Sequence, residues 1–238
     1  MESLVNKNIL VVGATGGIGS EVAKMLKNSK ANVFISGRNA AKLNQLAAEI
    51  GIPVQQVLEL DITDSSSVER AAEKLFSQVE SLDILINSAG IGIIKPLESL
   101  TYEDFSHTLD VNLKGTFHLL KSFLPKMKEV KKGLIINMPG VLGKTPMAGA
   151  AAYSASKYGL NGMLKSVREE LKRTDIRITN IYLGGVDTPF WENIDLKVQK
   201  DKFILAQEAA KAVWFLCQQP TSGVVSEMVI QPFNHQAI

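Results

Sequence analysis

Tyr153 and Lys157 are the two residues whose types and spacing point most directly to chemistry. They lie four positions apart, so on a helix their side chains share one face and the Lys157 ammonium can approach the Tyr153 hydroxyl. A free phenol has a pKa near ~10, which is too high for easy proton exchange at neutral pH, and a nearby cation favours the phenolate. The pair therefore predicts a tyrosine that acts as an acid or base, with its pKa lowered by the lysine.

A glycine-rich turn near the N-terminus predicts a dinucleotide site. The segment Gly13-Ala14-Thr15-Gly16-Gly17-Ile18-Gly19 lies between an apolar strand and an amphipathic helix. Backbone N–H groups at a helix start attract a pyrophosphate, and glycines let it approach closely. The spacing differs from the dehydrogenase fingerprint, and an ordinary glycine-rich turn is the alternative interpretation. We expect Gly13, Thr15, Gly16, Gly17, Ile18 and Gly19 to contact the cofactor.

The choice between NAD and NADP depends on the end of the second expected strand. A carboxylate about ~20 residues after the glycines normally holds the ribose 2′-hydroxyl of NAD, but no acid occurs between Glu21 and Glu49. Arg38 follows this strand and can grip a 2′-phosphate by paired hydrogen bonds, or it is a solvated residue at a helix start. Asp61 and Ile62 can contact the adenine edge, or Asp61 is a turn residue. The pattern favours NADP(H) over NAD(H).

The elements that must position these residues alternate along the chain. Strands are expected at residues 8–12, 31–36, 54–60, 82–86, 134–138, 176–183 and 228–230, and helices at 18–28, 40–50, 65–79, 102–128, 152–172 and 207–218. Strict alternation predicts parallel strands joined by right-handed crossovers. We expect an α/β fold, with residues 1–238 in a single doubly wound Rossmann-type domain and a mostly or fully parallel seven-stranded sheet. The site is expected at the carboxyl ends of these strands.

The composition excludes several function classes. Hydrophobic residues make up 45% and charged residues 21% of the chain, which is typical of a soluble globular protein. A net charge of +2 offers no field that would select a nucleic acid or an anionic membrane. Three scattered histidines and one cysteine give no metal-ligand spacing, so no metal is expected. The sequence shows no signal-peptide core and no run long enough to cross a membrane, so a cytoplasmic protein is predicted.

Taken together, these motifs resemble the short-chain dehydrogenase/reductase family over nearly the whole chain. Asn87-Ser88-Ala89-Gly90 resembles a family segment that stabilises the central sheet beside the cofactor, and Asn112 matches an asparagine that holds a water in a proton relay. Gly184-Gly185-Val186-Asp187-Thr188 resembles the segment near the nicotinamide. The resemblance adds Asn87, Ala89, Gly90, Gly184, Val186, Thr188, Tyr153 and Lys157 to the expected cofactor contacts.

The resemblance also implies roles. Tyr153 would protonate a carbonyl oxygen as hydride leaves NADPH, or deprotonate an alcohol in reverse, while Lys157 would bind the ribose hydroxyls and Asn112 would extend the relay. This implies an NADP(H)-dependent oxidoreductase acting on a small, apolar carbonyl or alcohol. Residues 185–205 would form a substrate lid, with apolar residues at 189–191. The long helices around 102–128 and 152–172 would build a homodimer or homotetramer.

One position departs from the family pattern. The family has a serine thirteen residues before its tyrosine, and this chain has Gly140 there. That hydroxyl normally donates a hydrogen bond to the substrate oxygen, and losing one such donor costs on the order of 10²–10³ in rate. The Gly140 backbone N–H, an ordered water and the Thr145 hydroxyl are the candidates to replace it. The departure favours an alternative function, an NADP(H)-binding regulatory or scaffold protein with weak or no turnover.

Overall fold

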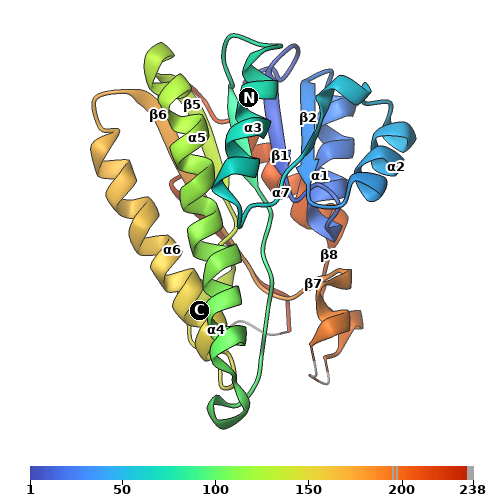
Figure 1. Ribbon diagram of the computed structural model, residues 1–238, viewed down its shortest axis with the longest axis vertical. Coiled ribbons are helices and arrows are strands. Elements are labelled where there is room, and N and C mark those ends of the chain that lie inside the picture. The colour runs from blue at the N-terminus through green and yellow to red at the C-terminus, as the bar shows by residue number, and fades with distance from the viewer. Residues whose placement is uncertain (195, 197, 235–238) are drawn as a thin grey trace.

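A computed structural model describes residues 1–194, 196 and 198–234, and its centre is a seven-stranded sheet (Figure 1). The strands are β1 (Asn8–Val12), β2 (Asn32–Gly37), β3 (Val57–Glu59), β4 (Ile84–Asn87), β5 (Lys132–Asn137), β6 (Asp175–Leu183) and β9 (Glu227–Ile230). Their order is β3-β2-β1-β4-β5-β6-β9, and every neighbouring pair is parallel. The structure confirms the predicted α/β fold with a fully parallel sheet.

Helices cover both faces of this sheet (Figure 1). They are α1 (Gly17–Asn28), α2 (Ala40–Ile50), α3 (Ser65–Phe76), α4 (Tyr102–Leu109), α5 (Gly115–Val130), α6 (Ala151–Glu170) and α7 (Ala206–Cys217). Alternate residues of each strand point to opposite faces. Ile9 and Val11 therefore enter the core under α1, α2 and α7, while Leu10 and Val12 enter the core under α3, α5 and α6. Burial on both faces explains why the strands read as continuous apolar runs.

The strand order reverses at β1, which pairs with β2 on one side and with β4 on the other. Crossovers on the two sides of β1 leave toward opposite faces, and this opens a crevice at the carboxyl ends of the strands. The glycine turn follows β1 and the 87–90 segment follows β4, so both lie at this crevice. The topology therefore brings together two segments that are more than 70 residues apart in the sequence.

Two expected elements differ from the prediction. The strand predicted at 54–60 begins as a 3₁₀ turn, Val54–Gln56, and only Val57–Glu59 joins the sheet, because Val54 lies on the surface with 66% of its area exposed. The long helical stretch predicted over 102–128 is helical throughout, but it is not one regular α-helix. A π-helical turn, Asp110–Lys114, separates α4 from α5. Its Asn112 is buried and hydrogen-bonded to Ile91, so a tertiary contact interrupts the regular helix.

The predicted lid segment has a feature that the sequence analysis missed. β7 (Val186–Asp187) and β8 (Ile204–Leu205) pair in parallel as a separate two-stranded sheet. Between them lie the 3₁₀ turns Pro189–Asn193 and Lys200–Lys202, while residues 195 and 197 are outside the described residues. The two ends of the segment are therefore joined to each other. In the described part of the chain, no helix is long and apolar enough to cross a membrane.

Candidate active site

Two adjoining cavities follow the carboxyl edge of the sheet. The larger, which we call the central cavity, has a volume of about 380 Å³ and is lined by the glycine turn, α6 and the residues after β4, β5 and β6. The second, the Arg38 cavity, has a volume of about 270 Å³ and includes Arg38, Asp61 and Ile62. The two share five residues, which are Thr15, Gly16, Ser88, Ala89 and Gly90. Together they form one elongated depression.

Tyr153 and Lys157 lie on the same face of the first two turns of α6, and both line the central cavity. The Lys157 Nζ lies 5.3 Å from the centre of the Tyr153 ring. The lysine side chain is almost fully buried, with 3% of its area exposed, and its ammonium donates to the Met138 carbonyl oxygen at 3.3 Å. The spacing of four residues therefore gives the shared face that the sequence predicts.

Burial moves the pKa values of this pair in opposite directions. It raises the pKa of the Tyr153 phenol to about 12 and lowers the pKa of the Lys157 ammonium to about 8, because each charged form loses contact with water. The direction for Tyr153 is opposite to the lowering predicted from the sequence. Desolvation outweighs the attraction of the lysine, which lies beside the ring. At neutral pH the phenol keeps its proton.

The glycine turn is in close contact with the segments that follow β4 and β6. Gly13 has a φ of +76°, and a Cβ there would lie 2.7 Å from the Ala89 backbone nitrogen. A Cβ on Gly17 would lie 2.6 Å from Thr188 Cγ2. Larger residues would separate these segments, so glycine is required at both positions.

The start of α1 suits an anion. Gly16 occupies the N-cap position and provides no side-chain cap, and the first turn carries no acidic residue. Residues 15–19 line the central cavity. The unpaired N–H groups and the dipole of a 12-residue helix are therefore available to a pyrophosphate, so the residues fit a dinucleotide.

The Arg38 cavity brings together the residues expected around the adenine and its ribose. Arg38 is exposed at the end of β2. The Asp61 carboxylate accepts hydrogen bonds from Thr63 N at 2.9 Å and Thr63 Oγ1 at 2.7 Å, and these bonds, with the charge of Arg38, lower the pKa of Asp61. Asp61 is thus a turn residue that also lines the cavity, so the two alternatives left open by the sequence are compatible. Ile62 is fixed by a contact of 3.0 Å between its carbonyl oxygen and His118 Nδ1.

Two of the predicted residues lie behind the cavities. Asn87 and Asn112 are buried and are not among the described residues that line either cavity. Asn87 donates to Thr116 Oγ1 at 2.9 Å. Asn112 bonds both to the N–H and to the carbonyl of Ile91, and its amide also donates to Ser156 Oγ at 3.0 Å. Their side chains tie together the segments that carry the site.

Gly140 lies opposite the tyrosine hydroxyl. A Cβ at this position would be 3.6 Å from Tyr153 Oη. Gly140 has φ +71° and ψ 167°, a region that is essentially limited to glycine. The loop after β5 is therefore built around a glycine, and a serine would be strained there. Thr145, one of the candidate replacements, is not among the described residues that line the central cavity.

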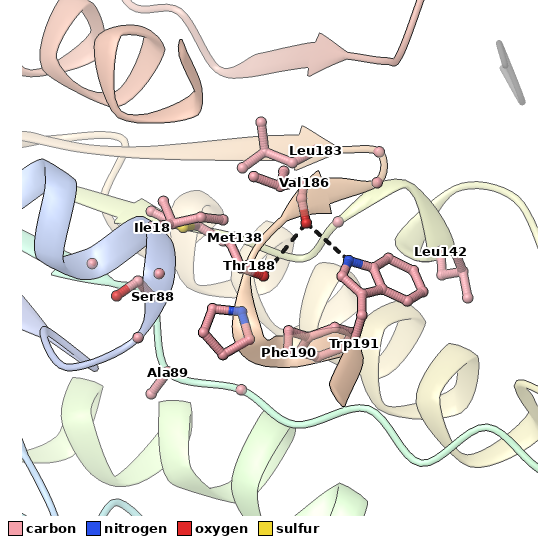
Figure 2. A pocket seen from close by; sticks show the side chains of 18 of the residues that line it. Ile18, Ser88, Ala89, Met138, Leu142, Leu183, Val186, Thr188, Phe190 and Trp191 are labelled. Atoms are coloured by element: carbon pink, nitrogen blue, oxygen red, sulfur yellow. Dashed lines mark hydrogen bonds between the residues drawn. The ribbon is translucent and has the colours of Figure 1, made fainter. Parts of the chain in front are cut away.

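Residues of the predicted lid segment line the central cavity beside Tyr153. The Phe190 ring lies 6.1 Å from the Tyr153 ring, and a Cβ on Gly92 would be only 2.4 Å from Phe190 Cζ. Trp191 Nε1 donates to the Val186 carbonyl at 2.8 Å, and Thr188 Oγ1 donates to the same oxygen at 3.4 Å. Figure 2 shows both bonds converging on this carbonyl. The 188–191 turn is thus fixed to β7.

The sequence analysis missed three residues of the site. Lys42 and Ile94 line the central cavity, and buried Ser156 joins Asn112 to the Tyr153 carbonyl by donating to it at 2.7 Å. Lys42 could have been found from the sequence, because it is a basic residue in the first turn of α2, shortly after Arg38. Ile94 and Ser156 could not, because their positions depend on long-range packing.

Comparisons with known proteins agree with this geometry. The model of the short chain dehydrogenase family matches residues 7–199. An uncharacterized oxidoreductase of Staphylococcus epidermidis is 33% identical over 232 residues, which cover 98% of this chain and all of that protein. A similar oxidoreductase of Staphylococcus saprophyticus is 32% identical over 235 residues, with 98% and 100% covered.

Two solved structures are also similar. One is an alcohol dehydrogenase from the archaeon Thermococcus sibiricus complexed with 5-hydroxy-NADP, with a TM-score of 0.88, 25% identity, and coverage of 97% of this chain and 98% of that one. The other is a metagenomic short-chain oxidoreductase in complex with NADP, with a TM-score of 0.82, 29% identity, and coverage of 97% and 99%.

Proposed function

Because the chain belongs to the short-chain dehydrogenase family, we propose that it is an NADP(H)-dependent oxidoreductase that interconverts a carbonyl and an alcohol. The observation that carries this proposal is the central cavity, where Tyr153 and Lys157 face the start of α1 and Thr188. A binding protein needs the helix start but has no use for a phenol with a buried ammonium beside it. The cavity therefore supports a catalytic role.

The cofactor proposal rests on the residues along the elongated depression. Residues 15–19 would hold the pyrophosphate, Arg38 the 2′-phosphate, and Asp61 and Ile62 the adenine. Lys157, Gly184, Val186 and Thr188 would contact the nicotinamide riboside. When bound, the nicotinamide ring supplies or accepts the hydride. The NADP-type ligands of two similar structures support the preference for NADP(H) over NAD(H).

The proton step is assigned to Tyr153. A phenol whose pKa is about 12 is protonated at neutral pH, and this is the state that can donate a proton to a carbonyl oxygen during reduction. Lys157 would orient the ribose and offset the charge that develops on the phenolate. Asn112 would act as a positioning residue, because it reaches the Tyr153 carbonyl only through Ser156. Its part in a water relay stays a prediction.

The substrate is expected to be uncharged, with small apolar groups beside its carbonyl or alcohol. Ile94, Met138, Leu142 and Met147 line the central cavity, and Phe190 lies beside the tyrosine. These groups offer no charge to a substrate. An uncharged ketone, an aldehyde or the corresponding alcohol fits such walls best.

Gly140 supports a second candidate, an NADP(H)-binding regulatory or scaffold protein. The residue opposite Tyr153 Oη has no hydroxyl, and its backbone conformation is suited to glycine alone. A substrate oxygen would then receive one hydrogen bond fewer from a side chain. Weak turnover with retained cofactor binding is the signature of this candidate.

NADPH oxidation against a panel of uncharged ketones and aldehydes distinguishes the two candidates. The oxidoreductase predicts turnover that falls on the order of 10²–10⁴-fold in Tyr153→Phe, while NADPH binding, measured by fluorescence titration, stays the same. The binding protein predicts equal background rates for both forms across the whole panel.

Assembly is the last part of this proposal. Tyr102 has 93% of its area exposed on α4, and Phe105, Phe117 and Tyr158 are exposed on α4, α5 and α6. A contiguous apolar patch would mark a subunit interface, and these side chains are the candidates to form one. We therefore keep the predicted homodimer or homotetramer, built through α4, α5 and α6, and light scattering on the purified protein would measure it. The single domain and the cytoplasmic location also stay predictions.

A further inference from the structure

A third cavity adjoins the central one beneath the lid segment. This lid cavity has a volume of about 490 Å³. Its walls come from the loop after β5, the lid segment and the residues after β9, and they include Val141, Leu142, Met147, Trp191, Val198 and Phe203. The polar residues that line it are Thr145, Gln199, Lys202, Gln231 and Asn234, of which Gln199, Lys202 and Asn234 are exposed. The cavity is therefore mainly apolar, with polar residues at its surface.

The three cavities form a row. The lid cavity shares Val141, Leu142, Met147, Gly184, Gly185 and Trp191 with the central cavity, and it shares no described residue with the Arg38 cavity. A dinucleotide that extends from Arg38 to Thr188 uses the first two cavities. The third shares only Gly184 with the residues assigned to the nicotinamide riboside, so most of it lies beyond the nicotinamide end, on the side away from the adenine.

Trp191 and its neighbours form a fixed aromatic wall between the central and lid cavities. Its ring lies 5.4 Å from Phe190 and 5.0 Å from Phe203, and its only polar atom is already bonded to the Val186 carbonyl. Figure 2 shows Leu142 beside Trp191 in the central cavity. A molecule that extends from one cavity to the other past Trp191 would contact apolar side chains. This contact favours an uncharged apolar chain.

We propose that the lid cavity is the subsite for the tail of the substrate. The reacting carbon faces Tyr153, and an uncharged alkyl or aryl chain passes Leu142 and Trp191 into the lid cavity. This inference rests on the proposed function, because it assigns a substrate class to the same site. A protein with this subsite would act on ketones and alcohols with a long apolar chain in preference to short ones.

A series of methyl ketones from 2-butanone to 2-decanone tests the subsite. Each buried methylene contributes a factor of about 4 in binding, so kcat/KM should rise by about that factor per carbon until the chain fills the cavity. Val198 lines the lid cavity and is not among the described residues of the central cavity. Val198→Trp should lower kcat/KM for 2-decanone at least tenfold and change that for 2-butanone less than twofold. The milder Val198→Leu should give a smaller loss in the same direction if the tryptophan impairs folding.

Calorimetric titration of the same ketones onto the NADP⁺-loaded protein gives a readout without turnover. Affinity that increases with chain length and decreases in the Val198 variants would support the subsite, whether or not a ketone is reduced. If the ketones bind in this way but none is reduced, the proposed reaction is wrong and the subsite is still supported. Rates and affinities independent of chain length would overturn the subsite while leaving the reaction intact. An equal loss for short and long ketones in Val198→Leu would overturn it as well.

Discussion

At the scale of single residues, burial acts in opposite senses on Tyr153 and Lys157, the two residues proposed to carry the chemistry. The tyrosine holds its proton more tightly than a free phenol, and the lysine holds its proton less tightly than a free amine. The first effect keeps the phenol protonated at neutral pH but makes it a weaker acid than a free phenol, while the second is a cost to folding. The proposed function would explain why a lysine with this cost is present.

This cost gives a prediction for Lys157→Met. The folded-state pKa of Lys157 is about 8 against an ordinary value of 10.5, so below pH 8 folding must bury a charge that the unfolded chain keeps in water. The variant should be more stable than the wild type at pH 7, by up to roughly 3 kcal/mol. The advantage should shrink as the pH rises from 8 and vanish above 10.5. Denaturant unfolding of both forms across this range would measure it.

Effects of pH that are common to both proteins cancel in the comparison. A Lys157→Met variant that is less stable than the wild type at pH 7 would show that the hydrogen bond to Met138 outweighs the cost of burial.

Gly140 leads to a second prediction at this scale. Gly140→Ser and Gly140→Ala should both destabilise the protein by about 1–3 kcal/mol, because each places a side chain at φ +71°. Thermal unfolding would measure this loss. The alanine variant controls for strain, so a higher rate of carbonyl reduction in the serine variant than in the alanine variant would report the hydroxyl alone. Unchanged stability in both variants would contradict the strain argument.

At the scale of elements, the π turn at 110–114 holds the site together by turning Asn112 inward. This side chain satisfies both backbone groups of Ile91 and reaches Ser156 on α6. It therefore links the segment after β4 to the helix that carries Tyr153. A regular helix would not provide the extra residue in this turn.

Removing this link should be costly. Asn112→Ala leaves the N–H and carbonyl of Ile91 without their partner, and each buried unpaired group costs about 1–3 kcal/mol. Asn44→Ala is the matched control, since Asn44 is exposed on α2 and should change stability by less than about 0.5 kcal/mol. Urea unfolding compares the two variants. An equal loss of stability in the two variants would mean that the hydrogen bonds of Asn112 do not hold these segments together.

The elements also show where sequence reasoning succeeds and where it fails. The bounds of α2, residues 40–50, agree with the prediction. Asn39 caps its start, and Gly51, in the left-handed conformation, ends it. Such signals are local. The β7–β8 pair and the π turn were missed, because a two-residue strand has no periodicity and Asn112 finds its partners far away in the sequence.

The same distinction applies to the candidate site. The glycine turn, Tyr153, Lys157 and Arg38 were predicted from their types and spacing, and the structure brings them to one edge of the sheet. The raised pKa of Tyr153 and the approach of Phe190 to Gly92 could not be predicted. Both depend on how completely distant segments cover the pocket, which no local pattern encodes.

At the scale of the whole molecule, the three cavities lie in a row along one edge of the sheet, and Arg38 lies at the end proposed for the 2′-phosphate. NADPH should therefore bind more tightly than NADH. Arg38→Ala should weaken NADPH roughly 10–100-fold and NADH less than about twofold, because only the 2′-phosphate loses a charge-assisted partner. Fluorescence titration measures all four affinities.

Arg70→Ala provides the control for loss of a positive charge, since Arg70 is exposed on α3. It should leave the ratio of the two affinities unchanged. Equal affinity of the wild-type protein for both nucleotides would refute the role of Arg38.

The parallel pairing of Val186–Asp187 with Ile204–Leu205 has a consequence for how this enzyme can evolve. Because the two ends of the intervening segment are fastened to each other, insertions or exchanges at residues 188–203 need not disturb the strands on either side. The segment between the two strands can therefore vary largely independently of them. Descendants that keep Thr188, which is proposed to contact the nicotinamide, can exchange the rest of the proposed substrate lid without rebuilding the proposed cofactor site.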